Sequence, residues 1–206
     1  MALAVSAIAA LWALFDATGV RPEWVLPVLW IESNFDPTLP NREGAPYYGI
    51  GQTSGAWLQA HGIAPADFLT WSAADQIRAA VQPYFAAVVA RYGPIRSGVR
   101  AYQANFLPAT LPTARALSAI VTVRGEAAYN ANRSLDFLRD GAITLSDLAA
   151  VVSFAAHRPE VQGAIVAAYA QRPDERPTPP VLGAEYTDPR AWLLAPVAIG
   201  AYAAGR

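Results

Sequence analysis

The stretch "WIESNFDPTLPNREGAPYYGIGQTS", Trp30 to Ser54, places one carboxylate ahead of a loop rich in proline, glycine and tyrosine. Glu32 directly follows the apolar run "VLPVLWI", so its side chain is expected to lie beside apolar neighbours. Desolvation disfavours a charged carboxylate, and a carboxylic acid kept neutral can donate its proton to a glycosidic oxygen. Loop glycines would let the backbone approach a sugar ring, where Gln52 could bind hydroxyl or acetamido groups. The alternative is a solvent-exposed glutamate on an amphipathic helix, followed by an ordinary loop.

The composition limits the class of protein. A chain of 206 residues suits one domain with a small appendage and can bury a sizeable core. Only 15% of its residues are charged and the net charge is −1, so no nucleic-acid partner is expected. Cysteine is absent, which excludes disulfides and thiolate metal sites, and we predict neither a metal nor a cofactor.

Both ends of the chain are apolar. No basic residue precedes Arg21 and Asp16 interrupts the N-terminal run, so we predict a buried first helix closed by Gly19, not a signal peptide. The C-terminal "AWLLAPVAIGAYAAG" is broken by Pro196, and both runs are too short to span a bilayer. Membrane contact is therefore not expected.

Helical signals dominate and no segment shows sustained period-2 alternation, which predicts an all-α fold. The second helix should begin at Pro22 and end between Ser33 and Asp36, because Pro37 disfavours the α region before it. Further helices are predicted at 54–62, 72–93, 95–106, 144–157 and 159–172. Residues 107–132 are left unassigned. These elements suggest a core of 1–110, a helical continuation of 111–171, a proline-rich connector of 172–190 and a final apolar helix of 191–206.

"IESNFDP" followed by "YYGIGQTS" resembles the lytic transglycosylase family, which has a goose-type lysozyme-like fold. The family pattern is a helix ending in Glu-Ser-x-Phe, then a loop, then Gly-Leu-Met-Gln. The matching positions here are Glu32, Ser33, Phe35, Gly49, Ile50 and Gln52. Gly51 stands where the family has methionine.

A third motif extends the resemblance over residues 10–107, about half of the chain. "IRAAVQPYFAAVVARYGPIRSGVRAYQANF" looks like the family's long helix running to Tyr-Gly, followed by a helix with Ala-Tyr-Asn. Ala101 and Tyr102 match, and Gln103 replaces the asparagine. A second "AYN" at 128–130 lies further from Gln52 than is usual in the family, so Tyr102 is the preferred match.

The resemblance implies that Glu32 alone serves as acid and base. It would protonate the oxygen between N-acetylmuramic acid and N-acetylglucosamine, then take the proton of the muramyl C6 hydroxyl as a 1,6-anhydro ring closes. Neither water nor a second carboxylate is required, unlike ordinary glycoside hydrolysis. Tyr102 would lie near the developing charge, although core packing is the alternative. The implied sugar contacts, each weighed against loop packing, are Ser33, Tyr47, Tyr48, Gly49, Gln52 and Gln103.

Other functions stay open at this point. Asp36 or Glu43 could position a water and make the enzyme a hydrolysing muramidase, or both could be solvated loop charges. A virion structural or binding protein could keep the fold without the activity, although the intact Glu32 counts against it. A membrane-associated helical protein is a third reading, suggested by the apolar ends.

The second half carries an EF-hand-like spacing. Positions 1, 5, 6, 8 and 12 of such a loop fall on Asp136, Asp140, Gly141, Ile143 and Asp147. Leu138 at position 3 cannot ligate and Asp147 is short, so we expect a turn and a helix cap without calcium.

"NFLPATL" and "ANRSLDFLRDGAITLSDL" resemble stretches of a peptidoglycan-cleaving family of phage virions. The resemblance implies location in a phage virion or delivery to the bacterial periplasm. Its implied partners are peptidoglycan glycan strands, with virion or tail proteins as neighbours.

Overall fold

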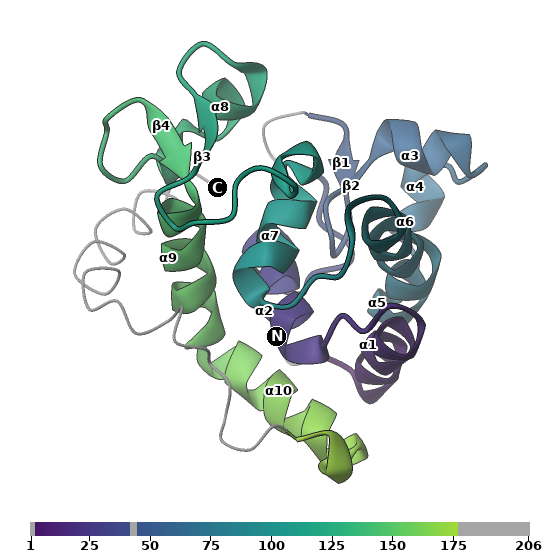
Figure 1. Ribbon diagram of the computed structural model, residues 1–206. Coiled ribbons are helices and arrows are strands. Elements are labelled where there is room, and N and C mark those ends of the chain that lie inside the picture. The colour runs from purple at the N-terminus through teal and green to yellow at the C-terminus, as the bar shows by residue number, and fades with distance from the viewer. Residues whose placement is uncertain (1–2, 42–44, 177–206) are drawn as a thin grey trace.

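Helix α2, Pro22–Ser33, runs through the middle of the computed structural model, which describes residues 3–41 and 45–176 (Figure 1). It packs against α1 (Val5–Thr18), α7 (Gly98–Phe106), α9 (Leu145–Ala156) and α10 (Pro159–Gln171). Val25, Leu26, Val28 and Leu29 are all buried, and a helix that is apolar on most sides needs such neighbours. The C-terminal end of α2, which carries Glu32, is thus fixed within the core.

Local signals set the ends of the first two helices as predicted. Gly19 adopts the left-handed conformation and its N–H bonds to the Phe15 carbonyl at the end of α1. Pro22 occupies the first turn of α2, where its missing N–H is no loss. Asn34 ends α2 in the left-handed conformation, so the helix stops immediately after Ser33.

The helix predicted for 72–93 is present but contains a wider turn. Ser72 caps α5 (Ala73–Gln76), a π-helical turn follows at Ile77–Val81, and α6 continues as Gln82–Tyr92. Pro83 has no N–H, and in a regular α-helix its ring would clash with the carbonyl four residues earlier. The wider turn, in which the Gln82 N–H bonds to the Ile77 carbonyl, accommodates it.

The fold is mostly helical, as predicted, but it also holds two small antiparallel sheets that the sequence did not predict. β1 (Tyr47–Tyr48) pairs with β2 (Thr53–Ser54) across the Gly49–Gln52 turn. β3 (Ile120–Val123) pairs with β4 (Ala142–Thr144), with an irregularity between Ile120 and Thr122. Strands this short are too brief to show an alternation of apolar and polar residues, and the irregularity in β3 interrupts any alternation there.

The remaining predicted helices are present with slightly shorter bounds. Short elements complete the described chain, namely α3 (Gly55–Ala60), α4 (Pro65–Phe68), η2 (Pro108–Thr110), α8 (Ala127–Ala131), η3 (Arg133–Leu135) and η4 (Pro173–Glu175). The connector beyond Arg176 and the predicted helix at 191–206 lie outside the described residues. Within residues 3–41 and 45–176, no helix is both long and apolar enough to cross a bilayer.

The EF-hand-like segment forms a turn and a helix cap, as predicted. Asp136 accepts hydrogen bonds from the Tyr129 hydroxyl (2.6 Å) and from the backbone N–H groups of Asp140 and Gly141. Asp147 and Thr144 cap α9 reciprocally. The described residues hold no group of three or more histidine, cysteine, aspartate or glutamate side chains arranged for a metal ion.

Candidate functional site

Glu32 lies half-buried in the last turn of α2, and the neighbouring helix α7 holds its side chain. The side-chain nitrogen Nδ2 of Asn105 donates a hydrogen bond to Glu32 Oε1 over 2.9 Å. Asn105 also lines a cavity of about 210 Å³. Glu32 is not itself a lining residue, so its carboxylate lies one hydrogen bond away from the cavity.

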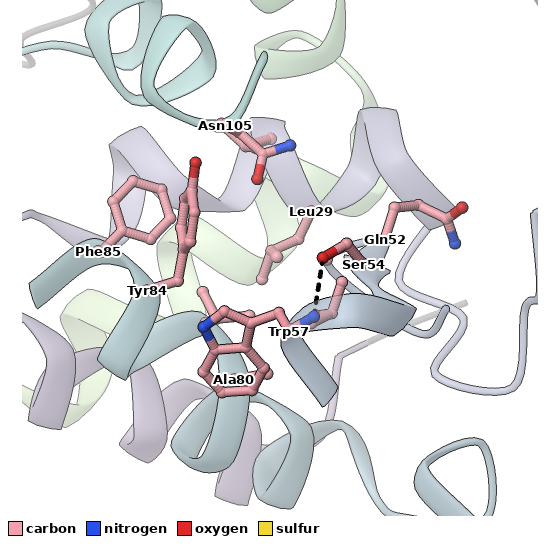
Figure 2. Close-up of a pocket in the computed structure, with 12 residues that line it drawn as sticks. Leu29, Gln52, Ser54, Trp57, Ala80, Tyr84, Phe85 and Asn105 are labelled. Atoms are coloured by element: carbon pink, nitrogen blue, oxygen red, sulfur yellow. Dashed lines mark hydrogen bonds between the residues drawn. The ribbon is translucent and has the colours of Figure 1, made fainter. Parts of the chain in front are cut away.

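The cavity lies between α2, the start of α3, the π turn with α6, and the end of α7 (Figure 2). Its apolar lining residues are Val28, Leu29, Ala80, Val81 and Phe85. Two further aromatic residues, Trp57 and Tyr84, line the cavity together with Gly51 and four polar residues, namely Gln52, Thr53, Ser54 and Asn105. Apolar and aromatic walls with a few placed polar groups are typical of small-ligand sites.

Two aromatic side chains of the cavity, Tyr84 and Trp57, are held by neighbouring groups. The Tyr84 hydroxyl donates to the Ala104 carbonyl over 2.7 Å. Burial raises the pKa of Tyr84 to about 12, and the nearby Tyr92 and Glu32 act in the same direction, so this hydroxyl stays protonated at neutral pH. The Trp57 indole stacks on His61 with ring centroids 3.7 Å apart.

Hydrogen bonds fix the Gly49–Gln52 turn to the end of α2. The Ser33 hydroxyl contacts the carbonyl oxygens of Leu29 (3.1 Å) and Ile50 (2.9 Å). The fully buried Gln76 accepts from the Ile50 N–H (2.8 Å) and donates to the carbonyls of Pro37 and Phe68. The turn therefore has a defined position relative to Glu32.

Unusual backbone conformations gather at the same place. Four non-glycine residues of the described chain have positive φ, and Asn34 (55°), Phe35 (65°) and Gln52 (47°) are three of them. Side chains disfavour this region, and such residues cluster at functional sites. Their grouping around Glu32 supports a site here, independently of the sequence motifs.

Two glycines of the turn have different structural roles. Gly49 has φ +72°, and a Cβ there would lie 2.3 Å from Gln76 Oε1, so glycine is required. Gly51, which replaces the methionine of the resembled family, lines the cavity. A Cβ at this position would lie 3.1 Å from Val81 and 3.7 Å from Leu29, so a long side chain would reduce the cavity.

The structure brings some of the predicted loop residues to the cavity and leaves others away from it. Gln52 lines it, but its Nε2 atom donates to the carbonyls of Leu39 and Gly49 and so holds the loop. Tyr47 is 43% exposed, while Tyr48 packs against the cluster of Leu58, Phe68 and Ala80. Neither tyrosine lines the cavity.

Helix α7 presents a different residue than the sequence suggested. Tyr102 is only 2% exposed and packs in the core beside Phe106. Gln103 is fully buried, accepting from Arg100 (2.5 Å) and donating to Thr110 (2.9 Å), and it does not line the cavity. Asn105, which was not predicted from the sequence, does line the cavity. Its spacing of three residues from Tyr102 places it near the same helix face, and this was the available signal.

The Asp36 side chain is hydrogen-bonded within its own turn. Its Oδ1 atom accepts hydrogen bonds from the backbone N–H (2.8 Å) and the hydroxyl (2.7 Å) of Thr38. Glu43, the other candidate base, lies outside the described residues.

The chain matches no family model, no curated protein and no solved structure. Its resemblance to lytic transglycosylases therefore depends on the short sequence motifs alone. Those motifs now meet in space, because Ser33 of the first is hydrogen-bonded to Ile50 of the second.

Proposed function

We propose that this protein cleaves peptidoglycan as a lytic transglycosylase, on a lysozyme-like arrangement of helices. The observation that carries the proposal is the hydrogen bond between Glu32 and Asn105 at the wall of an aromatic and polar cavity. The Ser33 bond supports it by joining the acid-bearing helix to the glycine turn. The "NFLPATL" resemblance supports a role in a phage virion or in the bacterial periplasm.

In this mechanism Glu32 acts twice. As a neutral acid it donates a proton to the oxygen between N-acetylmuramic acid and N-acetylglucosamine while positive charge develops at C1. As a carboxylate it then accepts the proton of the C6 hydroxyl, which attacks C1 and closes the 1,6-anhydro ring. The leaving sugar departs with the first proton, and no water is consumed.

Replacing Glu32 by glutamine tests the assignment. Glu32→Gln should lower the rate of sacculus clearing by about 10²–10⁴-fold, because it removes the acid and base while keeping the shape of the side chain. The circular dichroism spectrum should be unchanged. Asp67→Asn, which alters an exposed carboxylate on α4, is the matched control and should retain wild-type activity.

Two results would contradict the proposal. Clearing by Glu32→Gln near the wild-type rate would assign the chemistry to another residue. A wild-type protein that binds sacculi without clearing them would be a binding protein on the same fold.

A further inference from the structure

Asn105 presents the two ends of its side-chain amide to different surroundings. Nδ2 donates to Glu32 Oε1 over 2.9 Å. Figure 2 shows the amide nitrogen turned away from the cavity and the amide oxygen turned toward it. An ionised carboxylate only accepts hydrogen bonds, so its contact with the NH₂ end leaves the oxygen end for the cavity.

Several hydrogen bonds hold α7, the helix that carries this side chain. Ser97 caps the helix through the Arg100 N–H, and the Arg100 guanidinium binds the carbonyls of Leu111 and Ala114. The neighbouring Ala104 carbonyl accepts the Tyr84 hydroxyl bond from α6. Helix α7 is thus anchored in its first turn and again at Ala104, directly before Asn105, which favours a defined orientation of the amide.

We propose that Asn105 acts with both ends of its amide: Nδ2 positions the Glu32 carboxyl for proton transfer, and Oδ1 accepts a hydrogen bond from an N–H or O–H group of the bound sugar. The inference deepens the proposed function and rests on it. It assigns the cavity to a saccharide that carries a donor, such as an acetamido N–H, beside Asn105. The same side chain would then contact both the bound sugar and the Glu32 carboxyl.

Two substitutions separate the two ends. Asn105→Asp keeps an acceptor toward the cavity but loses the donor to Glu32 and adds a like charge beside it. Asn105→Leu removes both functions in a side chain of similar volume. A donor favours the ionised carboxylate, so its loss favours the protonated acid and moves the alkaline limb of the rate profile to higher pH.

The experiment measures release of anhydro-ended muropeptides against pH for wild type and both variants. We expect turnover to fall about 10- to 100-fold in both, because a misplaced acid loses its alignment. The alkaline limb should move to higher pH in both. Asn130→Leu, at an exposed position on α8, is the matched control and should leave rate and profile unchanged.

A second measurement uses chitotetraose, the tetramer of N-acetylglucosamine, and the inactive Glu32→Gln background. Adding Asn105→Leu should weaken binding about threefold to tenfold, as expected for one lost hydrogen bond. Adding Asn105→Asp should change it less than twofold. Equal binding by the two double variants would overturn the role of Oδ1.

A third measurement follows the Glu32 carboxyl carbon by NMR during a pH titration, and it does not depend on activity. The titration midpoint should rise in Asn105→Leu and stay unchanged in Asn130→Leu. An unchanged midpoint, or a wild-type rate profile in Asn105→Leu, would overturn the role of Nδ2. A wild type that releases no anhydro ends would refute the proposed function, while the titration and the binding series would still judge the two contacts of Asn105.

Discussion

A single hydroxyl joins the two halves of the proposed site. Ser33 is buried, and its bond to the Ile50 carbonyl connects the helix that carries Glu32 to the glycine turn. The resemblance implied a sugar contact for this residue, whereas the geometry gives it a positioning role. A motif preserves a residue type but does not say whether the side chain faces substrate or structure.

Sequence patterns pointed to residues whose motifs are short and local, and missed residues whose partners are distant in the sequence. Glu32 and Gln52 stand out because their motifs are compact. Gln76 and Asn105 make their decisive bonds to positions 26 and 73 residues away, to Ile50 and Glu32, and nothing local marks them. Only the folded chain shows that Asn105, and not Gln103, is the amide of α7 that reaches the acid.

The buried Tyr102 provides a test at the same scale. The family resemblance gives its hydroxyl a catalytic role, whereas its burial indicates core packing. Tyr102→Phe keeps the ring and removes the hydroxyl, so under the catalytic role we expect partial loss of turnover on sacculi with little loss of sacculus binding. Clearing rates and pull-down binding measure the two effects. Full activity combined with a lower melting temperature would make Tyr102 a core residue without a catalytic role.

At the scale of elements, the sequence predicted helices well and the small connecting structures poorly. Capping residues such as Ser72 and Ser97 act within one turn, so the helices that they cap could be predicted from the sequence. The two-residue strands β1 and β2 flank a turn that the distant Gln76 holds through the Ile50 N–H, a contact that no local pattern predicts. The π turn depends on how Pro83 is accommodated, which no period-based reading detects.

The glycine turn should be intolerant of a side chain at Gly49. Gly49→Ala and Gly62→Ala impose similar backbone strain, since φ is +72° and +70°, but only the first meets Gln76 and Phe68. We expect Gly62→Ala to cost about 1 kcal/mol and Gly49→Ala about 1–3 kcal/mol more. Urea unfolding measures both free energies. Equal losses would show that the turn can shift away from Gln76.

The loop at Asp136 should stabilise the fold in a pH-dependent way. Burial alone would raise the pKa of Asp136, but hydrogen bonds from Tyr129 and from the N–H groups of Gly141 and Asp140 outweigh it and lower that pKa. A lowered carboxyl pKa gives stability that is present above the ordinary value of about 3.9 and is lost as pH falls through the folded value. Asp136→Asn should therefore lower the melting temperature at pH 7, and the difference from wild type should shrink as the pH falls below the ordinary value of about 3.9. A constant difference across this range would assign the effect to packing.

At the scale of the whole molecule, the central fact is that α2 is both the core helix and the bearer of the acid. Its buried residues pack against helices from the beginning and the end of the described chain, α1 and α10. If Glu32 is the proposed acid, packing of this kind would hold it within the narrow tolerance that proton transfer needs. The apolar run that precedes Glu32 in the sequence therefore also fixes its position in the fold.

The chemistry of the products is the broadest prediction, because it depends on which groups the fold brings near Glu32. Hydrolysis with inversion needs a second carboxylate roughly 6.5–9.5 Å from the first, with space for a water. Asp36 Oδ1 is instead engaged by Thr38, which disfavours that role. The muramyl C6 hydroxyl is held at high effective molarity, so it should react in preference to water wherever Glu32 can reach it.

Digestion of purified murein in water with labelled oxygen, followed by mass spectrometry, decides between the two reactions. We expect mainly 1,6-anhydromuramic ends, each lighter by one water than a hydrolysed end and free of label. Asp36→Asn should leave both rate and products unchanged, because the reaction needs no second carboxylate. Mainly hydrolysed ends that carry the label would make the protein a muramidase, and loss of those ends in Asp36→Asn would identify the base.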